Sequence, residues 1–286
     1  MTTRIYSGEQ RIDALDPRDR GIAYGDGVFE TILIHHGTPV WWDAHLARLL
    51  RGCEVLGIGM PDPDFLRGES DALSAGYARG VLKLIVTRGV GERGYALSSN
   101  VPPTIVLSLS SAPTPPPRDG LILRWCDTPL AIQPRLAGIK HLNRLEQVLA
   151  RAEWNDADPG KPAIHEGLQC DTAGRVVSAT SANLFVLRDG RWLTPPVDAC
   201  GIAGVCRGWI LDHVAESAEA VLTRGEVESA DAIVLCNAVR GILPVAALES
   251  RRWSPRAETT ALRRRLAEAE PEFDSAHGTQ NSSEDA

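Results

Sequence analysis

Apolar and polar positions along this chain follow two periods. Runs rich in apolar and β-branched residues predict buried strands, because such side chains pack well on a pleated sheet. Apolar residues that recur every three or four positions predict helices with one buried face. The expected strands lie at 81–86, 104–109, 121–125, 183–187 and 231–236, and the expected helices at 44–56, 63–78 and 257–270, after Lys140 and after Gly204. The pattern therefore favours an α+β protein.

A proline-rich segment, Ala112–Pro117, separates two of the expected strands. Consecutive prolines hold the chain extended and stiff, so this segment predicts a connector between two domains. The residues from Asp274 onward are small and polar, which is typical of a disordered tail. We therefore expect an N-terminal α/β domain at 1–112, a linker at 113–119, a second domain at 120–272 and a tail at 273–286.

Length and composition limit the class of protein. With 286 residues, the chain is long enough for one large or two medium domains, each with its own core. Its 43% hydrophobic and 23% charged residues are typical of a globular protein in water. A net charge of -7 argues against binding nucleic acid, and no signal-like segment or long apolar run suggests a membrane. We therefore expect a cytoplasmic protein that acts on a small molecule.

Cysteine and histidine spacing gives no indication of a metal site. The six cysteines are scattered without a C-x-x-C pair, which favours reduced packing residues over a zinc knuckle or a redox dithiol. The adjacent pair His35-His36 precedes Gly37 in an expected hairpin turn, and two neighbours on a strand point to opposite faces. No metal cofactor is therefore expected.

Lysine is rare in this chain, and only Lys83, Lys140 and Lys161 occur. Schiff-base chemistry needs a primary amine that can lose its proton, and arginine cannot replace it because the guanidinium stays protonated. Lys161 lies in a turn signal and is expected to be solvated. Lys83 lies in a strand-like run, where it is either an edge residue or a cation that points into a site. Lys140 stands just before a helical pattern whose expected apolar face is Leu142, Leu145, Leu149 and Ala152.

The segment around Lys140, Gly138–Ala150 (GIKHLNRLEQVLA), resembles the cofactor-lysine segment of the aminodeoxychorismate lyases. These lyases belong to the fold type IV pyridoxal-phosphate enzymes, together with branched-chain and D-amino-acid aminotransferases. Other blocks resemble the same family and occur in the family's order. They are Arg20–Thr31, His45–Leu49, Ser181–Phe185, Thr194–Pro195, Gly201–Arg207 and Cys236–Gly241.

The resemblance implies a fold, a cofactor and a reactive amine. Fold type IV enzymes have two α/β domains joined by a short linker, bind pyridoxal 5′-phosphate in the interdomain cleft, and form homodimers. By this resemblance, Lys140 forms the Schiff base with the cofactor and then moves protons, once burial and nearby charge lower its pKa. Arg48, on the helix at 44–56, supplies positive charge for the cofactor phosphate. Thr31 matches a lyase threonine that helps to relay a proton, with a β-branched strand residue as the plain alternative.

Further cofactor contacts are implied by the matching blocks of the second half. Gly201–Arg207 precedes a helix-like run, so the amides of Val205 and Cys206 are expected to bind the cofactor phosphate at the start of that helix. Asn237 and Ala238 follow a buried-looking strand and match cofactor-binding positions. Glycine before a helix is common for structural reasons alone, and the match to the family strengthens this interpretation.

Substrate contacts are expected from the segment Thr87–Tyr95 (TRGVGERGY), which resembles a loop of the lyases. The resemblance implies that Arg93 and Tyr95 bind substrate carboxylates, and Lys83 is a third candidate cation. A glycine-rich hairpin with exposed charges is the alternative, above all for Arg88.

One position departs from the family pattern. In the family, a glutamate five residues before the asparagine of the S-x-N-L-F block pairs with the pyridine nitrogen of the cofactor, and here that residue is Ser178. A hydroxyl can hydrogen-bond a neutral nitrogen but does not stabilise a charged one as a carboxylate does, so a weaker electron sink is expected. This change favours an elimination that creates an aromatic ring over transamination. Two alternatives are that Glu166 reaches the ring instead, or that the protein is an inactive paralogue.

Together these observations predict a pyridoxal-phosphate lyase that converts 4-amino-4-deoxychorismate to 4-aminobenzoate and pyruvate, a step of folate biosynthesis. The first alternative is an aminotransferase for D-amino acids or branched-chain amino acids, which shares Lys140 and Arg48. The second alternative is a catalytically inactive protein that binds the cofactor. The fold alone permits all three functions.

Overall fold

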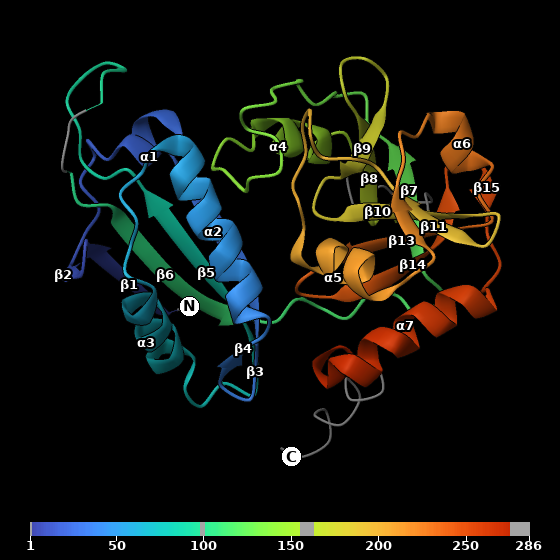
Figure 1. Cartoon of the computed structure of the whole chain (residues 1–286), viewed down its shortest axis with the longest axis horizontal. Helices are drawn as coiled ribbons and strands as arrows, with labels where there is room; N and C mark the ends of the chain where they lie inside the picture. Colours follow the sequence, from blue (N-terminus) through green and yellow to red (C-terminus); the bar gives the residue numbers. More distant parts are fainter. Residues whose placement is uncertain (1, 98–100, 155–162, 275–286) are drawn as a thin grey trace. The chain divides into compact units, whose positions relative to one another are not determined.

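The computed structural model describes residues 2–97, 101–154 and 163–274. These residues form two compact units, each built around its own sheet (Figure 1). One unit is Met1–Pro113 with Gln133–Arg144, and the other is Thr114–Ile132 with Leu145–Ala286. Lys161 and the expected tail beyond Asp274 lie outside the described residues.

The first unit is built on an antiparallel six-stranded sheet with the strand order β2-β1-β6-β5-β3-β4. Three helices accompany this sheet (Figure 1). The strands are β1 (Thr2–Ser7), β2 (Gln10–Ile12), β3 (Gly27–His35), β4 (Thr38–Pro39), β5 (Arg79–Thr87) and β6 (Thr104–Ser111). The helices are α1 (Arg20–Tyr24), α2 (Trp42–Leu56) and α3 (Pro63–Ser74).

Helices α2 and α3 pack against this sheet, and the buried core lies beneath them. Residues of β5 alternate in burial, as expected for a strand with one face on a core. Helix α2 ends at Gly57, whose φ of 63° is the left-handed conformation typical of a helix C-cap. Helix α3 begins after the capping residue Asp62 and ends at Ser74 rather than at the expected residue 78. The reason is Gly76, whose φ of 82° turns the chain out of the helix.

The segment that contains Lys140 extends the first sheet at the edge of β3. Phe29 donates its amide to the carbonyl of Lys140 (2.9 Å), and Leu142 donates its amide to the carbonyl of Gly27 (2.9 Å). These bonds help to place residues 133–144 in the first unit, whereas the sequence analysis assigned them to a second domain at 120–272. Pairing with an edge strand more than a hundred residues away leaves no trace in local periodicity.

The second unit contains a mixed nine-stranded sheet with the order β12-β11-β10-β13-β14-β7-β8-β9, and β15 pairs with β14. The pairs β7–β8, β7–β14 and β11–β12 are parallel. The strands are β7 (Leu121–Trp125), β8 (Glu166–Cys170), β9 (Val176–Ala179), β10 (Asn183–Arg188), β11 (Arg191–Thr194), β12 (Ser217–Glu219), β13 (Ala232–Asn237), β14 (Gly241–Leu248) and β15 (Arg251–Arg252). The helices are α4 (Leu145–Arg151), α5 (Val205–His213), α6 (Arg224–Glu228), α7 (Ala257–Ala269) and the 3-10 turn Pro271–Phe273.

Several strands of the second sheet are buried along almost their whole length. Almost every residue of β8, β9, β10 and β13 is buried, as expected for strands without a solvated face. Helix α5 packs against β13, and α7 packs against β14 (Figure 1). Among the described residues, no helix is long and apolar enough to cross a membrane.

Helix α4 differs from the packing expected for the helix after Lys140. It begins at Leu145, and the side chains of Leu145, Val148 and Leu149 are exposed, while Ala150 is buried. The apolar spacing therefore predicted a helix correctly but not a buried face. Spacing alone shows which residues share a side of a helix, and not what covers that side.

Candidate active site

Lys140 lies in the extended segment that pairs with β3, close to an aromatic ring. Its Nζ is 4.4 Å from the centroid of the Phe29 ring, and the Nζ of Lys83 is 5.3 Å from the same centroid. Two of the three lysines of the chain therefore flank one phenyl ring. This arrangement gathers the candidate amine and a candidate substrate cation within the first unit.

Lys140 has an unusual pKa for a lysine. Burial and the positive charge of Arg48 together lower the pKa of its amine to about 7, although Glu30 opposes these effects in part. An amine with a pKa near neutrality exists in both protonation states at pH 7, whereas an ordinary lysine is almost fully charged. Lys140 can therefore act as a nucleophile when neutral and return a proton when charged.

A buried carboxylate holds Arg48. Glu30 lies on β3 and is 1% exposed, and its Oε1 accepts a hydrogen bond from Arg48 Nε (2.8 Å). Its Oε2 accepts one from Arg48 Nη2 (2.5 Å) and lies 2.6 Å from His45 Nδ1. Burial alone would raise the pKa of Glu30, but the charge and hydrogen bonds of Arg48 outweigh it and hold the pKa at about 2. The carboxylate is therefore ionised and forms a bidentate ion pair with the guanidinium.

Thr31 and Lys83 are direct partners across β3 and β5. Directly paired residues of an antiparallel sheet point to the same face, and Phe29 shares that face because it lies two residues before Thr31. Lys83 is exposed and Thr31 is partly buried. An ammonium group, a hydroxyl and a phenyl ring thus lie on the face of β3 opposite to the one that carries Glu30.

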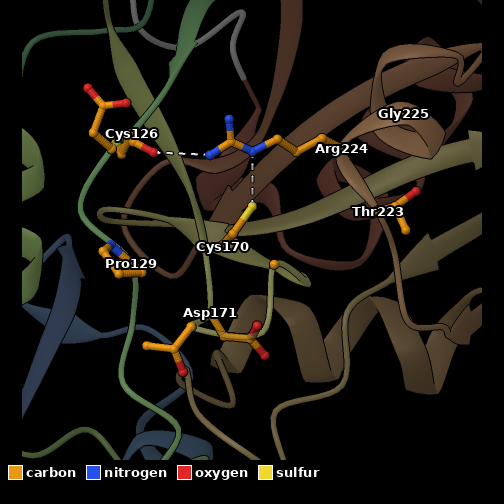
Figure 2. Close-up of a pocket in the computed structure, with 10 residues that line it drawn as sticks. Cys126, Pro129, Cys170, Asp171, Thr223, Arg224 and Gly225 are labelled. Atoms are coloured by element: carbon orange, nitrogen blue, oxygen red, sulfur yellow. Dashed lines mark hydrogen bonds between the residues drawn. The ribbon is translucent and has the colours of Figure 1, made fainter.

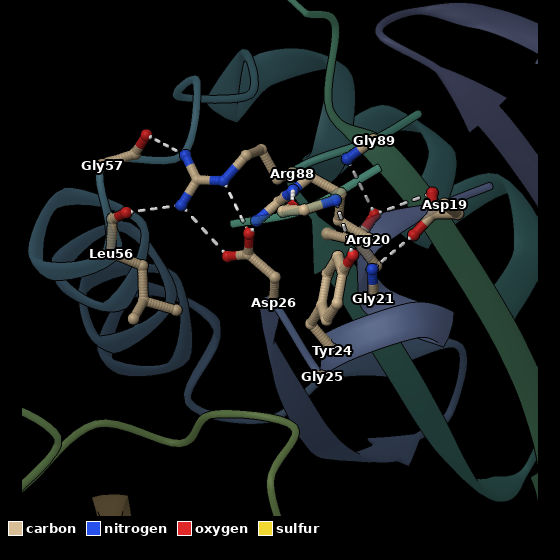
Figure 3. Close-up of polar contacts among 12 residues, drawn as sticks. Asp19, Arg20, Gly21, Tyr24, Gly25, Asp26, Leu56, Gly57, Arg88 and Gly89 are labelled. Atoms are coloured by element: carbon tan, nitrogen blue, oxygen red, sulfur yellow. Dashed lines mark hydrogen bonds and ion pairs between the residues drawn. The ribbon is translucent and has the colours of Figure 1, made fainter. Parts of the chain in front are cut away.

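Arg88 is buried, so the exposed-charge alternative for this residue was wrong. Its Nε and Nη2 donate to the carboxylate of Asp26 (2.7 and 3.0 Å), and Arg20 donates to the same carboxylate (2.9 Å) (Figure 3). The Arg88 guanidinium also donates to the carbonyls of Gly57 (2.5 Å) and Leu56 (2.7 Å), which end α2. This network joins the loop after β5 to the end of the helix that carries Arg48.

Arg93 and Tyr95 lie further along the same loop and are exposed. The ring of Tyr95 is 85% exposed and lies 5.4 Å from the ring of Tyr24, centroid to centroid. The carbonyl of Gly94 accepts a hydrogen bond from Arg20 (2.9 Å). The loop is therefore anchored at Gly94, while the two side chains predicted to bind substrate lie on the surface of the first unit.

Ser178 lies on β9, opposite Gln169 of β8, and is buried. Its hydroxyl donates to the carbonyl of Ala179 (3.0 Å). A hydroxyl that donates to its own backbone still offers its oxygen lone pairs and can rotate to another acceptor. Ser178 therefore supplies a small neutral polar group to the second unit.

Glu166 begins β8 in the same unit and is also buried. The hydroxyls of Thr180 and Ser181 and the amide of Gly167 (3.0 Å) all donate to its carboxylate. Three local donors therefore engage the carboxylate that the sequence analysis considered as a substitute for the missing family glutamate.

The start of α5 is shaped around a glycine. Gly204 is the N-cap residue and provides no capping side chain, and the next two amides belong to Val205 and Cys206. The first amides of a helix have no intrahelical acceptor and lie at the positive end of the helix dipole, which favours an anion. A Cβ at Gly204 would lie 2.0 Å from Asn183 Oδ1, and Asn183 Nδ2 donates to the carbonyl of Ile202 (2.9 Å). The asparagine of the S-x-N-L-F block thus packs directly against this turn.

Asn237 closes a turn at the end of β13. Its Oδ1 accepts hydrogen bonds from the amides of Val239 (3.1 Å) and Arg240 (2.9 Å), and its Nδ2 donates to the carbonyl of Ser181 (3.5 Å). Such a side-chain-to-backbone turn fixes the conformation of the residue inside it, which is Ala238. The two predicted cofactor contacts therefore lie in one ordered turn.

Cys206 of α5 and Cys236 of β13 are hydrogen-bonded to each other. Both side chains are fully buried. A hydrogen bond with Cys236 and burial raise the pKa of Cys206, so its thiol stays neutral. We therefore expect Cys206 to contribute a backbone amide rather than a thiolate.

Glu30 and His45 were not predicted as site residues from the sequence, although both stand in blocks that resemble the family. A signal was present in the alternation of β3, since residues two apart share a face and Glu30 falls among buried aliphatic residues. A buried carboxylate needs partners, and His45 and Arg48 lie three apart on one side of α2.

A separate pocket of about 640 Å³ lies in the second unit (Figure 2). Arg224 extends along it and donates to the Sγ of Cys170 (3.4 Å) and to the carbonyl of Cys126 (3.4 Å). None of the site residues predicted from the sequence lines this pocket. We therefore assign it no part in the chemistry.

Comparisons with known proteins identify the family of this chain. Residues 27–248 match the model of the family described as Amino-transferase class IV. The chain is 32% identical to the aminodeoxychorismate lyase of Vibrio harveyi over 239 residues, 81% of this chain and 86% of that protein. It resembles the crystal structure of 4-amino-4-deoxychorismate lyase from Pseudomonas aeruginosa with a TM-score of 0.86 and 42% identity, covering 94% of this chain and 100% of that one. The PLP-bound form of a hypothetical aminotransferase from Mycobacterium tuberculosis shares the fold, with a TM-score of 0.74, 20% identity and coverage of 93% and 98%.

Fold and site together define a fold type IV enzyme that uses pyridoxal 5′-phosphate. The chain belongs to the class IV aminotransferase family. The family, fold class and cofactor predicted from the sequence are therefore confirmed, while the position of the cofactor in an interdomain cleft stays a prediction. The described residues suit this cofactor, since Lys140 has a pKa near neutrality, Arg48 is fixed by an ion pair, and α5 begins without a capping side chain.

Proposed function

We propose that this protein is a lyase that converts 4-amino-4-deoxychorismate to 4-aminobenzoate and pyruvate. The observation that carries the proposal is Lys140, a buried amine whose pKa near neutrality suits it to exchange protons with a substrate carbon. The identity of 42% to a solved 4-amino-4-deoxychorismate lyase, over 94% of the chain, supports this choice of substrate. The product would feed folate biosynthesis.

The residues proposed to hold the cofactor are those implied by the resemblance to the family. Lys140 would bind the aldehyde carbon of the cofactor. Arg48 and the backbone amides of Val205 and Cys206 would bind its phosphate. Ser178, Asn237 and Ala238 would complete the set as neutral contacts. When bound, the cofactor supplies a conjugated ring that accepts electrons from the carbon bearing the substrate amine.

Lys140 and Thr31 are the residues proposed to transfer protons. Neutral Lys140 removes the proton from the ring carbon that carries the amino group of the substrate. The C–O bond to the enolpyruvyl group breaks, its electron pair leaves with the oxygen, and the six-membered ring becomes aromatic. The proton taken by Lys140 returns through Thr31 to the departing enolpyruvate, which becomes pyruvate. Gain of aromaticity drives the elimination.

Lys83, Arg93 and Tyr95 are the proposed contacts for the two substrate carboxylates. Of these three residues, Lys83 has the strongest support for this role. Its exposed ammonium shares a sheet face with Thr31 and lies near the same phenyl ring as Lys140. Arg93 and Tyr95 would act from the exposed loop after β5. The prediction of these contacts follows from the resemblance to the lyases.

An aminotransferase of D-amino acids or branched-chain amino acids is the second candidate function. The neutral Ser178 disfavours it, because transamination needs strong electron withdrawal by the ring nitrogen over the whole reaction. Glu166 offers no ready replacement, since three donors of its own unit engage its carboxylate. An inactive cofactor-binding protein is disfavoured by the lowered pKa of Lys140.

We also propose that the protein is cytoplasmic and forms a homodimer. Ile22, Tyr24 and Tyr95 are exposed on the first unit at 58, 36 and 85%, and the rings of Tyr24 and Tyr95 lie 5.4 Å apart. Exposed apolar side chains that lie together commonly mark an interface. Sedimentation equilibrium tests the dimer. A mass of one chain at micromolar concentration would contradict it.

The function is tested by supplying enzymatically generated 4-amino-4-deoxychorismate to the purified protein and measuring both products. Release of 4-aminobenzoate and pyruvate in equal amounts, absent in Lys140→Ala, is the expected result. Transfer of an amino group between D-alanine and 2-oxoglutarate without either product would replace the lyase by an aminotransferase.

A further inference from the structure

We propose that Glu30, together with His45, is a positioning residue that sets the direction in which the Arg48 guanidinium faces the cofactor phosphate. The inference rests on the proposed function, in which Arg48 binds that phosphate. Three donors converge on the carboxylate of Glu30, namely Arg48 Nε at 2.8 Å, Arg48 Nη2 at 2.5 Å and His45 Nδ1 at 2.6 Å.

The ion pair occupies one edge of the guanidinium. A guanidinium is planar and carries five N–H groups in fixed directions. When a carboxylate holds Nε and Nη2 together, the plane and the direction of the remaining N–H groups are determined. The pair is nearly shielded from water, since the side chain of Glu30 is 1% exposed and that of Arg48 is 11% exposed. Arg48 therefore does not need to lose side-chain freedom when a phosphate arrives.

His45 fixes the carboxylate in turn. Burial lowers the pKa of His45, so its imidazole is neutral at pH 7 and carries one proton. Since the Nδ1 atom contacts a carboxylate, that nitrogen must carry the proton and donate it to Glu30 Oε2. His45 and Arg48 lie three residues apart on α2, so one helix face presents both donors to β3.

The three donors explain why the residue at position 30 must be a carboxylate. A glutamine has nearly the same shape, but its NH₂ group would face Arg48 Nη2 or Arg48 Nε, donor against donor. The substitution Glu30→Gln therefore breaks the bidentate contact without opening a cavity. It changes orientation and charge with little change in packing.

Two effects of Glu30→Gln on phosphate binding have opposite signs. Removing a negative charge beside Arg48 would strengthen the binding of an anion. Loss of a fixed orientation would weaken it, because a mobile arginine has to be ordered on binding. The positioning effect is expected to dominate, since a buried bidentate contact constrains all the rotatable bonds of the side chain. The sign of the change therefore separates positioning from charge screening.

The test compares pyridoxal 5′-phosphate with pyridoxal, which lacks the phosphate, in titrations of the cofactor-free protein followed by absorbance. In Glu30→Gln the dissociation constant of pyridoxal 5′-phosphate should rise about tenfold or more, the loss expected for a charged hydrogen bond. The dissociation constant of pyridoxal should stay within about twofold. Glu69→Gln is the matched control, because Glu69 pairs with Arg4 (2.6 Å) elsewhere in the first unit, and it should change neither constant.

Each other outcome overturns the inference. Tighter binding of pyridoxal 5′-phosphate by Glu30→Gln means that Glu30 only screens Arg48. An equal loss for both ligands means that Glu30 only stabilises the unit. The variant Arg48→Met distinguishes a failure of the positioning role of Glu30 from a failure of the proposed function. If Arg48→Met weakens the binding of pyridoxal 5′-phosphate more than that of pyridoxal and Glu30→Gln does not, only the positioning role fails. If Arg48→Met weakens the binding of both ligands equally, Arg48 itself does not bind the phosphate.

A second pair of variants covers the case in which Glu30→Gln does not fold. In His45→Asn the side-chain NH₂ can still donate to Glu30, whereas in His45→Leu no donor remains. We expect His45→Leu to lose affinity for pyridoxal 5′-phosphate but not for pyridoxal, and His45→Asn to regain part of that loss. Identical affinities in the two variants would overturn the role of His45.

Discussion

The candidate residues of the first unit include several charged groups, whereas the candidate residues of the second unit are all neutral. In the first unit, the pKa of Lys140 is lowered to about 7 and that of Glu30 to about 2, and Arg48 joins them. The candidate positions of the second unit offer a hydroxyl, backbone amides and a carboxamide, at Ser178, Val205, Cys206 and Asn237. Proton transfer should therefore depend on the charges of the first unit, and anchoring of the cofactor on the backbone geometry of the second.

This difference determines which substitutions are informative. Interactions between charges in a buried setting extend over several ångströms and respond to the loss of a single proton. Hydrogen bonds from backbone amides respond instead to displacement of the chain by fractions of an ångström. Changes of charge should therefore act most strongly in the first unit, and changes of shape in the second.

The largest effect is expected from Lys140→Arg, which keeps the positive charge but cannot lose a proton near pH 7. If the first unit acts through proton transfer, turnover should fall by at least about 10³-fold, since the amine is both the nucleophile and the base. Steady-state release of 4-aminobenzoate measures it. Retention of a tenth of the activity would show that charge alone suffices and would remove the distinction between the two units.

A substitution of shape in the second unit should come next. Gly204→Ala places a methyl group 2.0 Å from Asn183 Oδ1, so either the asparagine or the start of α5 has to move. The free energy of unfolding should fall by about 2 kcal/mol, as in other overpacked sites. Cofactor affinity should fall with it, because the amides of Val205 and Cys206 move too. Chemical denaturation and a cofactor titration measure the two effects.

Gly208→Ala is the matched control within the same helix. A Cβ at Gly208 has nothing within 4 Å, and alanine favours a helix over glycine. We expect it to raise the free energy of unfolding by about 0.5–1 kcal/mol and to leave cofactor affinity unchanged. Equal behaviour of the two alanine variants would contradict a cradle shaped around Gly204.

The sequence predicted more of the local structure than of the charge pairing. Its periodicity predicted strands β5, β6, β7, β10 and β13 and helices α2, α3, α4, α5 and α7, but not the other strands, such as β3 and β14. Its blocks identified the family. Both kinds of signal depend on residues close together in the chain. It did not predict that Lys140 joins the sheet of the first unit, since that edge pairing links residues more than a hundred positions apart. It also missed the burial of Arg88 against Asp26 and the ion pair of Glu30 with Arg48. Tertiary contacts decide which charged residues pair with each other, and these contacts cannot be read from a single sequence.

The charges of the first unit also predict a pH dependence of stability in the cofactor-free protein. Because the pKa of Lys140 is lowered in the folded state, the folded chain binds fewer protons than the unfolded chain between about pH 7 and the ordinary lysine value. Stability from this group therefore rises with pH through that window and is lowest below pH 7. Lys140→Met should raise the free energy of unfolding at pH 7 by roughly 2 kcal/mol, because Lys140 is partly buried as a residue and solvent screens part of the effect.

The gain from Lys140→Met should shrink as the pH approaches 10, which urea denaturation at several pH values measures. Lys83→Met is the control, because Lys83 is exposed on the same sheet and its replacement should change stability by less than about 0.5 kcal/mol at every pH. A gain that stays constant with pH would show that packing, and not the charge of Lys140, is responsible.

The smallest effect is expected at Ser178, one of the neutral candidate residues of the second unit. If its hydroxyl donates a single hydrogen bond to the ring nitrogen, Ser178→Ala should lower the turnover number about fivefold, the value of a neutral hydrogen bond. Loss of this single hydroxyl group should leave the fold intact. A loss as large as that in Lys140→Arg would show that the second unit takes part in proton transfer.

Glutamate at the same position places a charge among the neutral candidate residues of the second unit. In Ser178→Glu a carboxylate can pair with the ring nitrogen, keep it protonated and strengthen the electron withdrawal that transamination needs. The variant should gain slow amino transfer from D-alanine to 2-oxoglutarate while still releasing 4-aminobenzoate. Chromatography of the amino acid products measures this gain. If the products of Ser178→Glu match those of the unmodified protein, the neutral residue at position 178 does not decide between elimination and transamination, and the preference has to come from the substrate contacts of the first unit.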